Sequence, residues 1–178
     1  MLKKIVVIGP ESTGKSTLCQ QLATHFNTTW VPEYARAYLT EYGTTYTYDD
    51  LLKIAHGQVE QEDKIAQEAT STSSPLLFID TDLYVMKVWS EFVFGKCHQW
   101  ILDNIATRKY DLYLLCNIDL PWVADELREY PTEEPRIQLY NIYKDLMINQ
   151  AVPWIEISGH YDERLQKAIN AVDALLKK

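Results

Sequence analysis

The sequence predicts an α/β fold: a three-layer sandwich in which a mostly parallel, five-stranded sheet lies between helices. Three observations indicate it. Short apolar, β-branched runs alternate with longer segments of helical periodicity, as in α/β domains. The runs are almost wholly apolar, which is typical of parallel strands buried on both faces. At 178 residues, 47% hydrophobic and 24% charged, the chain has the size and composition of one soluble domain spanning residues 1–178.

The strands and helices follow in alternation along the chain. Each predicted strand is an apolar run of three or four residues bounded by polar or turn-forming residues: Ile5–Ile8, Thr29–Val31, Leu76–Ile79, Leu112–Leu115 and Trp154–Ile157. The segments between and after them carry apolar residues at approximate helical spacing and predict helices: Lys15–Phe26, Asp49–Ala69, Leu83–Phe92, His98–Arg108, Pro135–Asn149 and Asp162–Leu176. A polar connection over 70–75 leads into the third strand.

Charge and composition exclude several classes of protein. With 17 Lys and Arg against 25 Asp and Glu, the formal net charge is −8, so a long polyanion is repelled and we expect no nucleic-acid partner. The first apolar run breaks at Gly9, and no stretch approaches the roughly 18 apolar residues of a membrane-spanning helix. Three scattered cysteines fit reduced thiols better than a disulfide framework or a zinc site. We expect a cytoplasmic protein with no membrane partner.

The strongest motif lies between the first strand and the first helix. Residues 9–16 match G-x-x-x-x-G-K-[ST], the phosphate-binding loop of P-loop nucleotide-binding proteins. Backbone N–H groups of such a loop surround the β-phosphate, Lys15 reaches the β- and γ-phosphate oxygens, and Ser16 can bind Mg²⁺. The predicted nucleotide-binding residues are Gly9, Pro10, Glu11, Ser12, Thr13, Gly14, Lys15, Ser16 and Thr17. Because the first strand begins almost at Met1, we expect no domain before this loop.

Two aspartates follow the third strand. Asp80 ends the apolar run and is the predicted second Mg²⁺ ligand beside Ser16. Asp82 would face the same way if the strand continued, which would place a second carboxylate near the cation. The alternative is that Asp82 caps the following helix.

Glu33 and Arg36 follow the second strand, and ligands of parallel α/β sheets gather beyond the carboxyl ends of the strands. Glu33 is therefore placed to accept the proton of an attacking hydroxyl, and Arg36 to orient that carboxylate or contact a phosphate. The alternative is a surface pair on a loop.

A Pro-bracketed segment at about 119–136 carries two arginines, Arg128 and Arg136. Mobile segments that close over transferring phosphates commonly deliver arginines, so we predict a lid segment with these two as its clamp. Without that location each would be an exposed salt-bridge partner. Trp89, close to the Asp80 end of the sheet, is the aromatic residue best placed to stack on a base.

The ordered motifs together carry a family resemblance. They are the loop from Gly9 to Thr17, Glu33-Tyr34-Ala35-Arg36, Gln58, Asp80-Thr81-Asp82, the segment from Trp122 to Arg128, and Tyr161-Asp162-Glu163-Arg164. This set resembles the ribosylnicotinamide kinase domain of bacterial NadR-type proteins over nearly the whole chain, here as a stand-alone chain. The resemblance implies a P-loop nucleoside-kinase-like fold, ATP and Mg²⁺ as cofactors, and phosphorylation of the 5′-hydroxyl of nicotinamide riboside in NAD salvage.

The resemblance and the motifs together assign expected roles. Lys15, Glu33, Asp82, Arg128 and Arg136 are the expected catalytic residues, with Glu33 the favoured base and Asp82 in reserve. The expected acceptor-binding residues are Glu33, Tyr34, Arg36, Gln58, Asp82 and Trp89, and Arg128 and Arg164 are expected to contact the nucleotide.

Two alternatives to this function stay open. One is a P-loop kinase for another nucleoside or a nucleoside monophosphate. The other is a nucleotide-sensing ATPase switch that phosphorylates no small molecule.

Overall fold

The computed structural model describes residues 1–70 and 75–177 and contains a five-stranded sheet with seven helices. The strands are β1 (Lys3–Ile8), β2 (Thr29–Val31), β3 (Leu76–Asp80), β4 (Leu112–Cys116) and β5 (Trp154–Ile157). The helices are α1 (Lys15–His25), α2 (Tyr34–Tyr42), α3 (Tyr48–Ala69), α4 (Leu83–Phe94), α5 (Gln99–Thr107), α6 (Glu133–Asn149) and α7 (Tyr161–Leu176). The polar connection predicted over 70–75 falls mostly outside the described residues.

Every strand pairing in the sheet is parallel, and the order is β2-β3-β1-β4-β5. The central strand β1 is hydrogen-bonded on both sides, which explains why Ile5 to Ile8 are fully buried. Because β1 and β3 are parallel neighbours, the loops that follow them lie next to each other at the carboxyl edge of the sheet. This is the edge where α/β proteins bind ligands.

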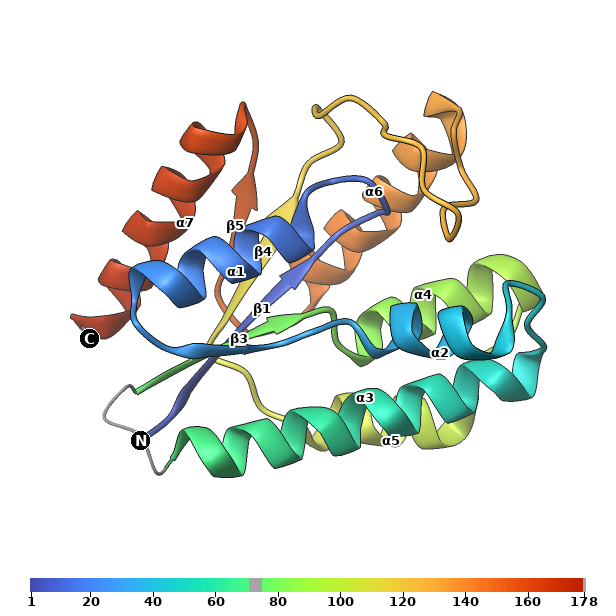
Figure 1. The fold of residues 1–178 in the computed structure, drawn as a ribbon, viewed down its shortest axis with the longest axis horizontal. Helices are drawn as coiled ribbons and strands as arrows, with labels where there is room; N and C mark the ends of the chain where they lie inside the picture. The colour runs from blue at the N-terminus through green and yellow to red at the C-terminus, as the bar shows by residue number, and fades with distance from the viewer. Residues whose placement is uncertain (71–74, 178) are drawn as a thin grey trace.

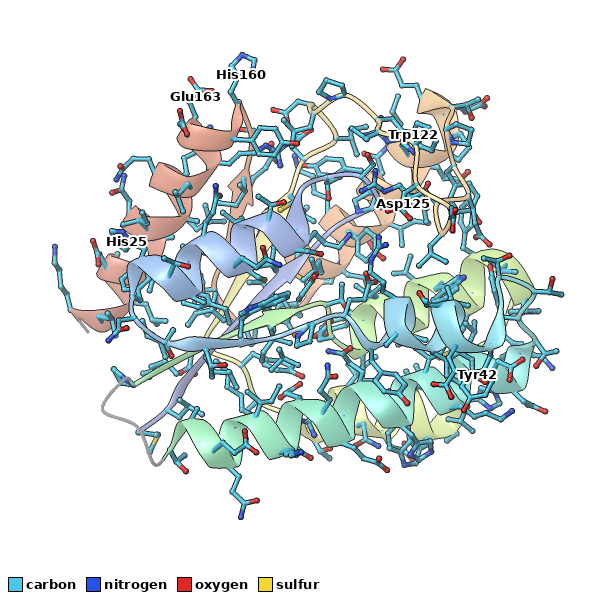
Figure 2. All side chains as sticks on the ribbon, viewed as in Figure 1. His25, Tyr42, Trp122, Asp125, His160 and Glu163 are labelled. Carbon is cyan, nitrogen blue, oxygen red and sulfur yellow. The ribbon has the colours of Figure 1, made fainter. Side chains whose placement is uncertain are left out.

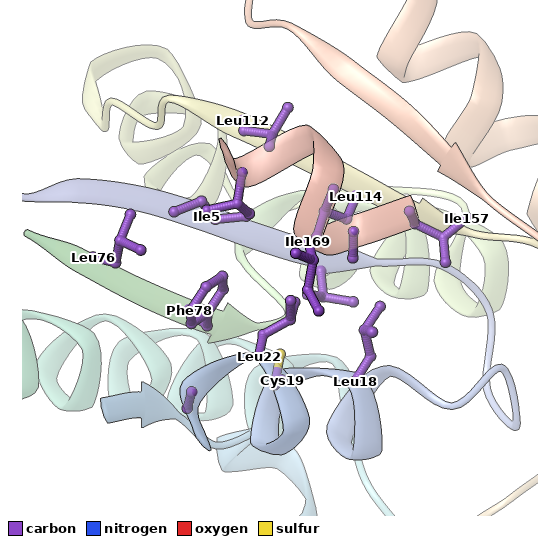
Figure 3. Close-up of a cluster of buried hydrophobic side chains, with 14 of the residues drawn as sticks. Ile5, Leu18, Cys19, Leu22, Leu76, Phe78, Leu112, Leu114, Ile157 and Ile169 are labelled. Carbon is purple, nitrogen blue, oxygen red and sulfur yellow. The ribbon is translucent and has the colours of Figure 1, made fainter. Parts of the chain in front are cut away.

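Helices cover both faces of the sheet, and the two faces carry separate apolar clusters (Figure 1). One cluster joins the sheet to α1 and α7 through residues such as Leu22 and Ile169 (Figure 3). The second joins the opposite face to α3, α4 and α6 through residues such as Val88 and Leu139. A third cluster packs α2 to α5 against one another beyond the sheet. The predicted three-layer α/β fold is therefore confirmed.

One helix was missed by the sequence analysis, which treated the residues after β2 as a loop. α2 spans only nine residues and buries two apolar side chains, Ala35 and Leu39, so it offers few turns over which a helical repeat can be recognised. α6 begins at Glu133, two residues before the predicted start, so residues 133–136 of the predicted lid segment lie in this helix. Among the described residues, no helix combines the length and apolar character that crossing a membrane requires.

Candidate active site

The loop between β1 and α1 has the backbone of a phosphate cradle. Gly9 and Gly14 have φ angles of 143° and 77°, which residues with a side chain rarely adopt. A Cβ at Gly9 would also lie 2.7 Å from the carbonyl oxygen of Cys116. Gly14 is the N-cap residue of α1 and, having no side chain, leaves the first helical N–H groups to an anionic ligand. All of residues 9–17 line one cleft.

Lys15 and Ser16 line this cleft, and Ser16 connects it to the buried Asp80. Lys15 Nζ donates a hydrogen bond to the carbonyl oxygen of Pro10 over 2.8 Å, so the ammonium group lies against the cradle. Ser16 Oγ donates to Asp80 Oδ2 over 2.5 Å and ties α1 to the end of β3. Within the described part of the chain, Asp80 Oδ1 is buried without a hydrogen-bond partner.

The Asp80 carboxyl group is suited to a cation. Burial, reinforced by the negative charge of Glu33, raises the pKa of Asp80 to about 7, while Lys15 acts in the opposite direction. Its partnerless oxygen and the neighbouring Ser16 hydroxyl are hard oxygen donors of the kind that Mg²⁺ takes. These residues therefore fit the predicted magnesium site.

Glu33 and Arg36 enter the cleft from the start of α2. Glu33 is the N-cap residue of that helix, directly beyond β2, and lines the cleft together with the cradle. Its effect on the pKa of Asp80 shows that the two carboxyl groups interact electrostatically. Arg36 also lines the cleft, and its Nη1 lies 3.1 and 3.3 Å from the two carboxylate oxygens of Asp125. Asp125 belongs to the β4–α6 connection, residues 117–132 (Figure 2).

An aromatic and acidic wall closes the other side of the cleft. Trp89 Nε1 donates to Tyr46 Oη over 2.8 Å, and the two rings meet edge to face with centroids 4.8 Å apart. Tyr46 Oη in turn donates to Glu129 Oε2 over 3.0 Å. Of these, the sequence analysis named only Trp89. It also missed Tyr130 of the β4–α6 connection, and it missed further lining residues whose helical spacing resembles that of ordinary core residues: Val85, Val88, Phe92, Leu139 and Tyr143.

Tyr34 and Gln58 are not among the residues that line the cleft, and their expected role as acceptor-binding residues stays a prediction. Gln58 is buried; its Oε1 accepts from the N–H of Tyr34 over 2.8 Å, and its Nε2 donates to the carbonyl of Thr81 over 3.1 Å. The Tyr34 ring covers Gly57, where a Cβ would lie 2.1 Å from the ring. Both residues hold α2 against α3 and the end of β3, and so position Glu33 and Asp80.

Asp82 caps α4, which is the alternative that the sequence analysis left open. Its Oδ1 accepts from the N–H of Tyr84 over 3.0 Å at the start of α4, and its Oδ2 accepts from the hydroxyl of buried Tyr113 over 2.7 Å. Both oxygens are therefore engaged away from the cradle. β3 ends at Asp80 and the chain turns through Thr81, whose φ is 68°, so Asp82 does not continue the strand; its expected catalytic, acceptor-binding role stays a prediction.

Of Arg128, Arg136 and Arg164, only Arg128 lines the cleft, as Arg36 does; its guanidinium donates to the carbonyl of Val123 within the connection. Arg136 is buried in α6, and its Nη2 donates to the carbonyl of Leu120 over 3.3 Å. Arg164 is buried too, and its Nη1 donates to the carbonyl of Thr13 over 2.9 Å. Arg136 thus holds the backbone of the connection and Arg164 that of the cradle, and their expected contacts with phosphate and nucleotide stay predictions.

A protein-family model described as an AAA domain matches residues 4–164, from β1 into the first turn of α7. The chain belongs to this AAA-domain family. The matched range contains Asp80 and every residue that lines the cleft.

Curated relatives of this AAA-domain chain include two larger proteins. They are the trifunctional NAD biosynthesis/regulator proteins NadR of Escherichia coli and Salmonella typhimurium, each 28% identical over 180 residues. The alignment covers 98% of this chain and 43% of each relative, so the chain spans less than half the length of these relatives.

Solved structures of two kinds resemble the AAA-domain chain. NadR protein in complex with NR has a TM-score of 0.79 at 23% identity, over 98% of this chain and 49% of that one. Thymidylate kinase from Ehrlichia chaffeensis has a TM-score of 0.64 at 13% identity, over 96% and 98% of the two chains. At these identities the likeness shows the fold, which is the predicted P-loop kinase fold.

Proposed function

We propose that this AAA-domain protein is an ATP-dependent kinase that phosphorylates the 5′-hydroxyl of nicotinamide riboside to nicotinamide mononucleotide, a step of NAD salvage. The observation that carries the proposal is the shared cleft: Glu33 lines it together with the phosphate cradle and interacts with the buried Asp80. The chain is similar to NadR, one structure of which is a complex with NAD and AMP-PNP and another a complex with NR. This similarity supports ATP and nicotinamide riboside as the two ligands of the proposed reaction.

On the nucleotide side, residues 9–17 would hold the phosphates of ATP. Lys15 would release the Pro10 carbonyl and place its ammonium group on the β- and γ-phosphate oxygens. Ser16 and Asp80 would hold Mg²⁺, which when bound neutralises charge on those oxygens.

On the acceptor side, Glu33 would orient the 5′-hydroxyl and take its proton. The hydroxyl oxygen forms a bond to the γ-phosphorus as the bond to the bridging β–γ oxygen breaks, and the electron pair leaves with ADP. Arg128 would stabilise the transferring phosphoryl group from the β4–α6 connection.

The chemistry of the wall suits a cationic nucleoside. Glu33 and Glu129 supply negative charge, and Trp89 with Tyr46 supplies aromatic faces, to which a positively charged nicotinamide ring is attracted. A nucleoside monophosphate would need free basic groups for its phosphate on that side, where Arg36 is paired with Asp125 and carboxylates stand beside it.

ADP production by the purified protein with MgATP tests this proposal. The reaction is run without acceptor, with nicotinamide riboside, and with a panel of common nucleosides and nucleoside monophosphates. Turnover that requires nicotinamide riboside is the expected result. Turnover with a different acceptor would overturn the substrate and keep the kinase, whereas acceptor-independent hydrolysis would favour an ATPase switch.

Lys15→Ala is expected to lower phosphoryl transfer by about a thousandfold or more, because the transition-state charge on the γ-phosphoryl group loses its nearest cation. The matched control is Lys53→Ala, which removes an exposed lysine of α3 that pairs with Asp50 outside the cleft. Circular dichroism and a thermal melt establish that both variants are folded. Near-normal turnover in Lys15→Ala would refute the assignment of the cradle.

A further inference from the structure

The second and third variable residues of the cradle, Glu11 and Ser12, bind the β4–α6 connection. Glu11 Oε1 accepts from the N–H of Tyr130 over 2.6 Å, and Glu11 Oε2 accepts from the N–H of Glu129 over 2.9 Å. Glu11 Oε1 also lies 3.4 Å from the indole Nε1 of Trp122, which donates to it. The connection therefore has two arms that bind one carboxylate: a first arm at Trp122 and a second arm at Glu129 and Tyr130.

Ser12 adds a contact to the first arm. Its Oγ accepts from the N–H of Val123 over 2.9 Å. Arg128 lies between the two arms and donates to the carbonyl of the same Val123. Figure 2 shows Trp122 and Asp125 on this connection, close to the loop that follows β1. The guanidinium that lines the cleft is thus oriented by backbone groups that Glu11 and Ser12 hold in place.

A carboxylate inside a phosphate cradle needs a physical reason, because it repels the anion that the loop binds. Here the negative charge is shared among three N–H donors, and hydrogen bonds to a charged acceptor are about twice as strong as neutral ones. A glutamine offers one oxygen instead of two, and an aspartate is shorter by one methylene group. Glutamate alone among these side chains has both the reach and the two acceptors that the geometry uses.

We infer that Glu11 is a positioning residue: it holds the β4–α6 connection against the cradle and thereby orients Arg128 toward the γ-phosphoryl group. The inference rests on the proposed function for the role of Arg128, whereas the hold of Glu11 on the connection stands on the contacts themselves. Glu11 is not a catalytic residue in this account, since it acts through the connection. Arg36 and Asp125 form a second, more exposed tether between the connection and α2.

Limited trypsin digestion tests the hold on the connection without any assay of activity. Trypsin cleaves after Arg128, and cleavage requires the connection to leave the cradle. Glu11→Ala is expected to raise the rate of cleavage at the Arg128–Glu129 bond by about tenfold or more, and Glu11→Gln by less, since opening becomes easier as acceptors are lost. Glu60→Ala, which removes an exposed glutamate of α3, is the charge-matched control and should cleave as the wild type does. Equal cleavage in all four proteins would overturn the inference.

A double-mutant cycle tests whether Glu11 acts through Arg128. Glu11→Ala and Arg128→Ala should each lower kcat by about tenfold to a hundredfold, with smaller effects on the KM for ATP. The kcat of the double variant should lie within about threefold of the kcat of Arg128→Ala. A residue that acts only through Arg128 has nothing left to position once Arg128 is removed. Losses that multiply in the double variant would overturn the inference. Glu11→Gln repeats the cycle should Glu11→Ala fold poorly, and an inactive wild type would refute the proposed kinase while the digestion result still stands.

Discussion

Asp80 and Asp82 are two positions apart in the sequence and serve different purposes in the structure. Burial raises the pKa of each to about 7. Asp80 keeps one oxygen without a partner beside Ser16, whereas both oxygens of Asp82 accept hydrogen bonds, from Tyr84 and Tyr113. Asp80 therefore has an oxygen available to a cation, whereas protein donors already occupy both oxygens of Asp82. Partners, and not residue type, distinguish the two carboxyl groups.

The raised pKa of Asp82 predicts a pH-dependent stability. An aspartate in the unfolded chain has a pKa near 3.9, so between about pH 4 and pH 7 the folded state holds a proton that the unfolded state releases. The free energy of unfolding should therefore fall as the pH rises through this window, by up to about 1.4 kcal/mol per pH unit for each such group.

Asp82→Asn should flatten this dependence, because asparagine cannot ionise and still offers an oxygen to the N–H of Tyr84. Urea unfolding from pH 4.5 to 8 in EDTA measures how steeply the free energy of unfolding falls with pH. Asp80, buried with a similar pKa, contributes the pH dependence that remains in the variant. Parallel curves for the variant and the wild type would show that Asp82 ionises in the folded protein as an ordinary aspartate does.

At the scale of elements, α2 and the end of β3 are joined through α3. Gln58 on α3 reaches both, accepting from the first helical N–H of α2 and donating to Thr81 directly after β3. Thr81 has a φ of 68°, which costs a β-branched residue free energy unless its surroundings hold it there. The separation between Glu33 and Asp80 thus depends on a buried amide that touches neither of them.

Gln58→Ala should lower the free energy of unfolding by about 1–3 kcal/mol, because it leaves a buried N–H and a buried carbonyl without partners. Gln61→Ala is the matched control on the same helix, since Gln61 donates to the carbonyl of Pro32 at an exposed position. The control should lose less than about 1 kcal/mol. Chemical denaturation of the two variants gives the comparison, and equal losses would contradict a structural role specific to Gln58.

At the scale of the whole molecule, the strand order brings distant segments to one edge of the sheet. β1, β2 and β3 end side by side because all pairings are parallel, and the connection after β4 crosses the same edge. The cleft between them is lined by the cradle, α1, α2, α4, the β4–α6 connection and α6, so a ligand bound there contacts segments far apart in the sequence. Such a ligand should stabilise the molecule as a unit.

MgATP should therefore raise the melting temperature. At a hundred times its dissociation constant, a ligand adds about 2.7 kcal/mol, which for a domain of this size corresponds to roughly 5–10 °C. Lys15→Ala should lose most of the shift, and Asp80→Asn should lose the part that depends on Mg²⁺. Thermal melts with ATP, in Mg²⁺ or in EDTA, measure both effects. An undiminished shift in Lys15→Ala would place the nucleotide elsewhere.

The sequence by itself determined the α/β class, the five strands and the phosphate cradle. Each of these rests on interactions among neighbouring residues: apolar runs that must be buried, and glycines whose φ angles at Gly9 and Gly14 suit few other residues. The confirmed fold follows from such local patterns, as does the presence of Glu33, Arg36, Trp89 and Arg128 in the cleft.

Only the tertiary structure decided which of the remaining polar side chains face the cleft and which hold it from behind. Arg164 binds the carbonyl of Thr13 from 151 residues away, and Glu11 binds Tyr130 from 119 residues away. No local sequence pattern identifies such a pair. The residues that surround an arginine or a carboxylate in the sequence do not reveal whether its side chain contacts a ligand or a backbone group. The partner that desolvates and pairs each charge is supplied by the packing of the whole chain.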